Sequence, residues 1–221
     1  MSRPRPLIAI DGPAGSGKST LARRLAETLD LPYLNTGLMY RALTLMALSR
    51  GVDVDDGASL AALARGMTFD LNESVRPPEL RIDGAVPGPE LSSEEVESSV
   101  SRVSRHPEVR AVLRAQQRRL GEGGGVVEGR DIGTVVAPDA DVKVFLAADE
   151  SERIARRTQE RWVSSEEVAR AMSVRDALDA RTNPLEPAPD AVAIDTTGLG
   201  ADEVFAAVLA LVRARLPGAG G

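Results

Sequence analysis

The segment of residues 12–19 constrains the fold of this chain more than any other stretch. It reads GPAGSGKS and fits the pattern G-x-x-x-x-G-K-[ST]. An apolar run, residues 7–10, precedes it, and a helix-like stretch, residues 21–29, follows it. Glycines let the backbone curl so that several N–H groups point into one hollow at the positive end of a helix dipole. The sequence therefore predicts a strand, a phosphate-binding loop and a helix in succession.

Two side chains of this loop complete a site for a polyphosphate. The Lys18 ammonium can reach the β and γ phosphates of a nucleotide, and the Ser19 hydroxyl can be a ligand of Mg²⁺. A glycine turn that only joined a strand to a helix would need neither residue. We therefore assign phosphate binding to Gly12, Pro13, Ala14, Gly15, Ser16, Gly17, Lys18, Ser19 and Thr20.

The composition excludes several other kinds of site. The 221 residues include no cysteine, which rules out disulfides, zinc–thiolate centres and a cysteine nucleophile. The single histidine, His106, precedes Pro107, and we expect it at a helix end or in a turn. A formal net charge of −6 disfavours a general nucleic-acid surface. No run of about 18 apolar residues occurs, so we expect no transmembrane helix and a cytoplasmic protein.

Five short apolar runs alternate with helical patterns along the chain. Unbroken apolar runs of this length are typical of parallel strands covered by helices on both faces. We therefore predict one domain, residues 1–221, with an α/β P-loop fold and a five-stranded parallel sheet. Functional loops in such sheets lie at the carboxyl ends of the strands. The expected strands cover residues 7–10, 33–34, 126–127, 142–146 and 191–194.

Two further stretches carry polar residues at strand ends. Thr36 can cap the helix that follows the second strand, and its hydroxyl and Arg41 could hold one phosphate of a ligand; the alternative is a capped helix with a solvated arginine. Glu128, Arg130 and Asp131 follow a buried strand, where charges must be paired or used. An acid at this strand end organises Mg²⁺ in P-loop enzymes, and a salt-bridged loop is the alternative.

Residues 66–95 consist of short extended pieces separated by turn residues. This pattern predicts a small antiparallel insert, with a hairpin turn at Asp83-Gly84. One helical region is expected over about 96–120. It carries Ser101 and Arg110, which by spacing alone could be solvated. Arg153, Arg157 and Arg161 repeat every four residues on a later helix, either as a solvated stripe or as a lid over about 151–168. The closing helix, residues 201–216, should face the sheet with Phe205, Val208, Leu209 and Val212.

Taken together, these stretches resemble those of the bacterial cytidylate kinases over nearly the whole chain, about residues 8–212. The phosphate loop alone is shared by many families, whereas the order and spacing of the other pieces are specific. The pieces that carry the resemblance are IDGPAGSGKST, NTGLMYRAL, SSVSRVSRHPEVR with a following QQRR, EGRDIGTVV, and RDALDAR with a following PLEPAPDA.

The resemblance implies roles for individual residues. Equivalents of Arg41 and Arg130 hold the phosphate of the acceptor, the insert binds the monophosphate, and Arg153 and Arg157 belong to the lid. Equivalents of Ser101, Arg110 and Asp131 recognise cytosine. The substrate-binding residues implied in this way are Thr36, Arg41, Ser101, Arg110, Arg130, Asp131, and, at the ribose, Arg175, Asp179 and Arg181.

The chain departs from the family pattern at several positions. Glu128 and Asn35 stand where the family usually has aspartate, so the geometry of a second-shell Mg²⁺ carboxylate differs here. Ser92 replaces a common arginine, and Thr36 a common serine. The spacing from Asp179 to Pro184 is about two residues shorter than usual, which weakens the assignment of Arg181.

We therefore expect phosphoryl transfer from MgATP to CMP and dCMP by a monomeric enzyme, with Lys18, Arg41, Arg130, Arg153 and Arg157 as catalytic residues. Two alternatives stay open. A small P-loop kinase for UMP or another acceptor would lack a pocket in which Ser101, Arg110 and Asp131 converge on one base. A P-loop ATPase without an acceptor would hydrolyse ATP in the absence of any monophosphate.

Overall fold

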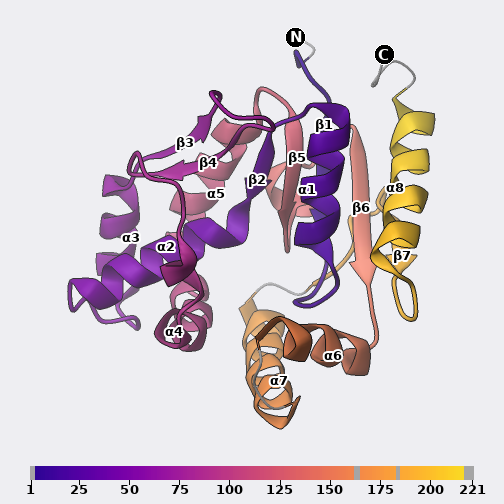
Figure 1. Cartoon of the computed structure of the whole chain (residues 1–221). Coiled ribbons are helices and arrows are strands. Elements are labelled where there is room, and N and C mark those ends of the chain that lie inside the picture. The colour runs from indigo at the N-terminus through magenta and orange to yellow at the C-terminus, as the bar shows by residue number, and fades with distance from the viewer. Residues whose placement is uncertain (1–2, 162–164, 183–184, 217–221) are drawn as a thin grey trace.

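A twisted sheet with helices on both faces forms the body of the molecule (Figure 1). The computed structural model describes residues 3–161, 165–182 and 185–216. In these ranges the strands run in the order β3-β4-β2-β5-β1-β6-β7. The strands are β1 (Leu7–Asp11), β2 (Tyr33–Asn35), β3 (Phe69–Asn72), β4 (Glu79–Ile82), β5 (Gly125–Gly129), β6 (Val142–Ala147) and β7 (Val192–Asp195).

Eight α-helices lie in the described ranges, together with a 3₁₀ turn, η1 (Pro89–Ser92), and a π-helical turn, η2 (Ile132–Val136). The α-helices are α1 (Lys18–Leu29), α2 (Thr36–Ser49), α3 (Gly57–Gly66), α4 (Glu94–Ser104), α5 (Pro107–Gly121), α6 (Glu150–Arg161), α7 (Ser165–Thr182) and α8 (Ala201–Arg215). Among the described residues, no helix is long and apolar enough to cross a membrane.

The apolar runs form the parallel centre of the sheet, as predicted. β1 pairs in parallel with β5 on one side and β6 on the other, and β2 and β7 continue the sheet outward. Alternate residues of β1 enter separate cores. Leu7 and Ala9 pack with α2, α3 and α5, whereas Ile8 and Ile10 pack with α1 and α8. Because both faces are covered, every residue of β1 is buried, which explains the unbroken apolar sequence.

The predicted number of five strands is wrong, because the insert joins the main sheet. β4 lies in parallel beside β2, with Tyr33 opposite Glu79, and β3 pairs antiparallel with β4. The predicted Asp83-Gly84 hairpin turn is confirmed, with positive φ at both residues. Phe69, Leu80 and Ile82 are buried in the core shared with α2 and α5, so burial makes the insert an extension of the sheet.

The helical region expected over 96–120 consists of two helices, α4 and α5. The break falls at His106, which is the N-cap of α5, and Pro107 occupies the first turn, where proline is tolerated. The expectation of a helix end at His106 is thereby confirmed. On α8, Val208 and Val212 are fully buried, and Phe205 and Leu209 pack partly buried against the same core, as the helical spacing predicts.

The carboxyl ends of β1, β2 and β5 meet at one edge of the sheet. It is the edge toward which the arrow of β6, which is parallel to β1, points in Figure 1. Helix α6 follows β6 at this edge, and α7 contacts α4. The residues between β1 and α1, between β2 and α2, and after β5 are therefore close in space. These are the three strand-end stretches in which the sequence predicts functional residues.

Candidate active site

The phosphate loop joins β1 to α1, as predicted. Gly17 has φ +89° directly before α1, and Gly12 has φ +151°. A side chain at Gly12 would place its Cβ 2.4 Å from the carbonyl oxygen of Leu146, so only glycine fits there. The Lys18 ammonium lies back over the loop and donates to the Pro13 carbonyl at 2.5 Å. A lysine and a helix N-terminus at one hollow suit a polyanion.

Glu128 is buried at the end of β5 and is connected to the phosphate loop. Its Oε2 accepts a hydrogen bond from the Ser19 hydroxyl at 2.9 Å, and its Oε1 accepts one from the Tyr33 hydroxyl at 2.5 Å. Burial raises the pKa of Glu128, and the nearby Lys18 charge opposes that rise. The structure thus brings together the two oxygen-bearing residues that the sequence assigns to Mg²⁺. Hydroxyl and carboxylate oxygens are donors that this hard cation prefers.

Thr36 contacts the same strand end, and the prediction that it caps α2 is wrong. Asn35 is the N-cap residue, and it makes no side-chain capping bond. Thr36 is the first helical residue, and its hydroxyl donates to the carbonyl oxygen of Glu128 at 2.8 Å. The reason is the pairing of β2 with β5, which places the start of α2 beside the backbone of Glu128.

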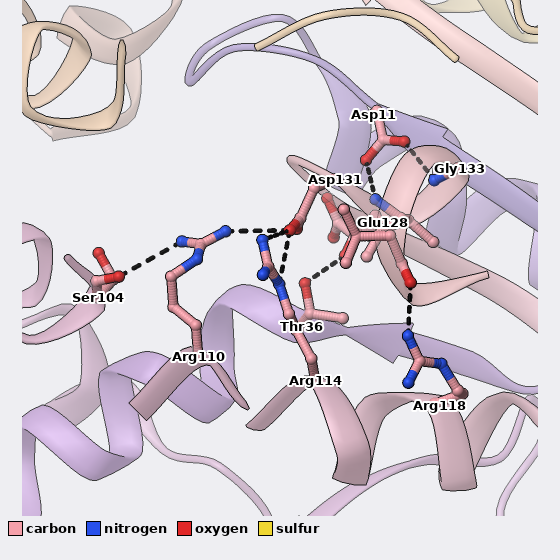
Figure 2. Close-up of polar contacts among 11 residues, drawn as sticks. Asp11, Thr36, Ser104, Arg110, Arg114, Arg118, Glu128, Asp131 and Gly133 are labelled. Atoms are coloured by element: carbon pink, nitrogen blue, oxygen red, sulfur yellow. Dashed lines mark hydrogen bonds and ion pairs between the residues drawn. The ribbon is translucent and has the colours of Figure 1, made fainter. Parts of the chain in front are cut away.

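Asp11 links the phosphate loop to the segment after β5. Its two carboxylate oxygens accept hydrogen bonds from the backbone N–H groups of Ile132, at 2.8 Å, and Gly133, at 2.7 Å (Figure 2). Burial raises the pKa of Asp11 to about 6, although these two hydrogen bonds oppose the rise. Asp11 was not predicted from the sequence. The sequence pattern that could have indicated it is the one that indicated Glu128, namely a carboxylate at the end of a buried apolar run.

Asp131 lies at the centre of an arginine cluster (Figure 2). Arg110 donates to its Oδ2 from Nη2 at 3.0 Å, and Arg114 donates to the same oxygen from Nε at 2.9 Å and from Nη2. Arg110 also donates from Nη1 to the Ser104 carbonyl at 3.4 Å. The structure therefore brings Arg110 and Asp131 together, as the predicted base pocket requires. Arg114 was not predicted.

Ser101 and Arg41 come from the elements beside this cluster. Ser101 is buried on α4, and within the described residues its side chain makes no hydrogen bond to Arg110 or Asp131. Arg41 donates to the Leu91 carbonyl at 2.9 Å and forms an ion pair with Glu97 at 2.6 Å. The guanidinium that the sequence assigns to an acceptor phosphate is thus held by a carboxylate of α4.

Helix α6, on which the lid is predicted, packs against the phosphate loop. Arg153 of α6 is buried and donates to the Ala14 carbonyl at 3.2 Å, so it is not part of a solvated stripe. A Cβ at Gly15 would lie 2.8 Å from the Arg153 carbonyl oxygen, which shows how closely α6 packs on the loop. Arg157 is partly buried on the same helix, and Arg130 is partly buried after β5.

Several predicted residues cannot be compared with the structure. Residues 162–164 of the expected lid and the helix end expected near 183–184 lie outside the described ranges. Helix α7 carries the three residues expected at the ribose, but their side chains lie outside the described part, as does that of Arg161. The three are Arg175, Asp179 and Arg181.

A cavity of about 350 Å³ adjoins the phosphate loop. The loop, the start of α1, α6 and the start of α8 contribute lining residues. Among these residues, Arg156 donates to the Thr196 hydroxyl at 3.0 Å and to the Thr196 carbonyl at 2.7 Å. The lining residues include Gly15, Gly17, Thr20, Leu21, Arg156, Thr196, Leu199 and Val204.

The sequence matches one protein family over almost its whole length. The family model described as Cytidylate kinase matches residues 8–214. The chain belongs to the cytidylate kinase family. A cytidylate kinase of Geobacillus kaustophilus (strain HTA426) is 45% identical over 217 residues, which cover 95% of this chain and 97% of the relative. A cytidylate kinase of Rhodococcus jostii (strain RHA1) is 43% identical over 224 residues, 97% and 98% of the two chains.

Solved structures support the fold of this cytidylate kinase family member. An uncharacterized protein from Eubacterium ventriosum has a TM-score of 0.51 at 12% identity, with 95% of this chain and 99% of that chain covered. At such low identity the likeness concerns the arrangement of helices and strands alone. Family membership confirms the resemblance that the sequence motifs carry.

Proposed function

We propose that this chain transfers the γ-phosphoryl group of ATP to CMP and dCMP, forming ADP and CDP or dCDP. One observation carries the proposal. Glu128, which is bonded to Ser19 of the phosphate loop, and Asp131, which is bonded to Arg110, stand three residues apart at one strand end. The proposed donor and acceptor sites are therefore adjacent. Membership of the cytidylate kinase family supports CMP as the acceptor.

Recognition of cytosine is supported by one acceptor and one donor of the arginine cluster that make no hydrogen bond within the described residues. All contacts to Asp131 use Oδ2, and within the described residues Oδ1 makes no hydrogen bond. The Nε of Arg110 is buried and has no hydrogen-bond partner among them. Cytosine offers an amino donor at N4 and acceptors at N3 and O2, so a carboxylate oxygen and a guanidinium N–H match it. Uracil offers the opposite pattern at positions 3 and 4, which leaves buried groups mismatched.

The donor side of the proposal uses the loop and the adjoining cavity. Backbone N–H groups of the loop and the Lys18 ammonium would bind the β and γ phosphates. The cavity of about 350 Å³ borders the loop and is lined by Leu21, Leu199 and Val204 as well as polar groups, which suits the adenine base. The Ser19 hydroxyl would hold Mg²⁺, which neutralises phosphate charge when bound, and Glu128 would orient that hydroxyl.

The proposed reaction depends on correctly placed charges and needs no strong general base to remove a proton. An oxygen of the CMP phosphate, already anionic, forms the new bond to the γ-phosphorus, and the bond to the β,γ-bridging oxygen breaks with its electron pair leaving on ADP. Arg41 and Arg130 would hold the acceptor phosphate, since a guanidinium pairs bidentately with phosphate. Arg153 and Arg157, in a lid over about 151–168, would cover the transferring group and exclude water. The insert over about 66–95 would support the acceptor.

The proposal is tested by measuring ADP release from MgATP with and without CMP and identifying the product. We expect ADP and CDP in equal amounts, with little ADP when CMP is omitted. ADP released at the same rate with and without CMP would identify an ATPase instead. A kinase active on some other acceptor but not on CMP would contradict the assignment of the acceptor.

A further inference from the structure

The Asp131 carboxylate is bound unevenly. Arg110 and Arg114 follow each other by one turn of α5 and so lie on the same face of that helix. Both guanidiniums approach Oδ2, and Arg114 approaches it with two nitrogens (Figure 2). Of the Asp131 side chain, 11% is exposed, against 24% for that of Arg114. One oxygen of a nearly buried carboxylate thus has three donors, while the other has none among the described residues.

We propose that Arg114 is a positioning residue that determines how selectively the site binds cytosine. This inference rests on the proposed function, and it concerns a residue that the predicted site did not include. Arg114 would not touch the base. It would fix the Asp131 carboxylate with Oδ2 turned toward α5, so that Oδ1 can accept the N4–H of cytosine.

The physical reason lies in what Arg110 and Asp131 would do alone. An arginine and a carboxylate prefer a bidentate pair, in which two N–H groups meet two oxygens. Such a pair would occupy Oδ1 and a further N–H of Arg110, and neither group could then bind cytosine. Arg114 takes Oδ2 with Nε and Nη2, which leaves Arg110 a single contact through Nη2. The second guanidinium also offsets the cost of burying the carboxylate.

Arg118 provides a matched control on the same helix. It lies one further turn along α5 and donates to the carbonyls of Val136, at 3.1 Å, and Val135, at 2.6 Å. It therefore anchors the turn that follows Asp131, and none of its hydrogen bonds reaches the carboxylate. Loss of Arg118 tests whether mere anchoring of this turn affects selectivity.

The test compares kcat/KM for CMP and UMP in Arg114→Leu, Arg114→Lys and Arg118→Leu. For Arg114→Leu we expect KM for CMP to rise about tenfold and the CMP:UMP ratio to fall about tenfold, the range of one base contact. KM for ATP and kcat at saturating CMP should change less than about twofold, because the donor site is untouched. Arg114→Lys offers one point charge in place of the fork and should recover part of the ratio. Arg118→Leu should keep the wild-type ratio.

The Asp131→Asn variant separates failure of this inference from failure of the proposed function. If Asp131→Asn lowers the CMP:UMP ratio and Arg114→Leu does not, Arg114 has no positioning role. If Asp131→Asn leaves the ratio unchanged, recognition of the base by Asp131 is itself wrong. A ratio that falls equally in Arg118→Leu would also overturn the inference, since general anchoring would then explain it. Should Arg114→Leu fail to fold, Arg114→Lys, which retains the charge, takes its place. A CMP:UMP ratio below that of the wild type would then support the inference, and a wild-type ratio would overturn it.

Discussion

Three buried carboxylates at neighbouring strand ends differ in their hydrogen-bond donors, and the donors decide what each can do. Asp11 is held by two backbone N–H groups, so its place is tied to the path of the chain at Ile132 and Gly133. Glu128 is held by two hydroxyls, which can exchange partners with a metal or a phosphate. Asp131 is held by guanidiniums that keep one oxygen available.

The buried Asp11 makes stability depend on pH. Its pKa rises from 3.8 to about 6 on folding, so the folded state binds more protons between those values. The cost of burying the charge is fully present above pH 6 and disappears as the pH falls below 4. Relative to Asp11→Asn, the free energy of unfolding of the wild type should therefore rise by about 2–3 kcal/mol between pH 7 and pH 4. Urea titrations of both proteins at several pH values measure this difference, and parallel curves would contradict it.

Lys18 carries the clearest prediction for activity. Replacement of Lys18 by alanine removes the charge that the loop directs at the phosphates, and we expect kcat/KM to fall by about 10²- to 10⁴-fold. Lys143, the other lysine of the chain, is the control. Its ammonium is bonded to Pro138 and Asp190 and to no residue of the loop, so Lys143→Met should lower stability and leave kcat nearly unchanged. Near-normal turnover in Lys18→Ala would refute the assignment.

Helix α4 follows the insert and carries a carboxylate that pairs with the arginine expected to bind the acceptor phosphate. Its Glu97 pairs with Arg41 at 2.6 Å, and both side chains are largely buried. An acceptor phosphate on Arg41 would compete with this carboxylate for the guanidinium. We therefore expect Glu97→Gln to lower KM for CMP about threefold to tenfold, because the amide binds a guanidinium more weakly than a carboxylate does. Initial rates at varied CMP measure the effect. An increase in KM would mean instead that Glu97 orients Arg41 for the phosphate.

Elements with strong local signals could be predicted from the sequence. The five apolar runs, the loop between β1 and α1 and the Asp83-Gly84 turn each follow from residues adjacent in the chain. The break between α4 and α5 was overlooked although Pro107 indicates it. The place of β3 and β4 in the sheet could not be predicted locally, because it depends on pairing with β2 and on burial of Phe69 and Leu80.

At the scale of the whole molecule, the site exists because three parallel strands end at one edge. The sequence predicted Lys18 and Ser19 from the phosphate-loop motif, and Glu128 and Asp131 from their position at the end of a buried strand. The structure places the first two at the start of α1 and the other two at the end of β5. Residues that contribute to the site from the face of a helix were harder to predict from the sequence. Arg114 repeats with Arg110 at a spacing that also fits a solvated face, and only the packing of α5 beside the segment after β5 distinguishes the two.

The measurement that tests the central claim most directly is kcat/KM for CMP against UMP, with AMP, GMP and a control without acceptor in the same assay. Recognition of cytosine by Asp131 and Arg110 predicts that CMP is preferred over UMP by about 10²-fold or more, since a mismatched buried hydrogen bond discriminates strongly. Purine nucleotides should support little turnover. Equal values for CMP and UMP would contradict base recognition at Asp131, and equal ADP release in the control would contradict the kinase itself.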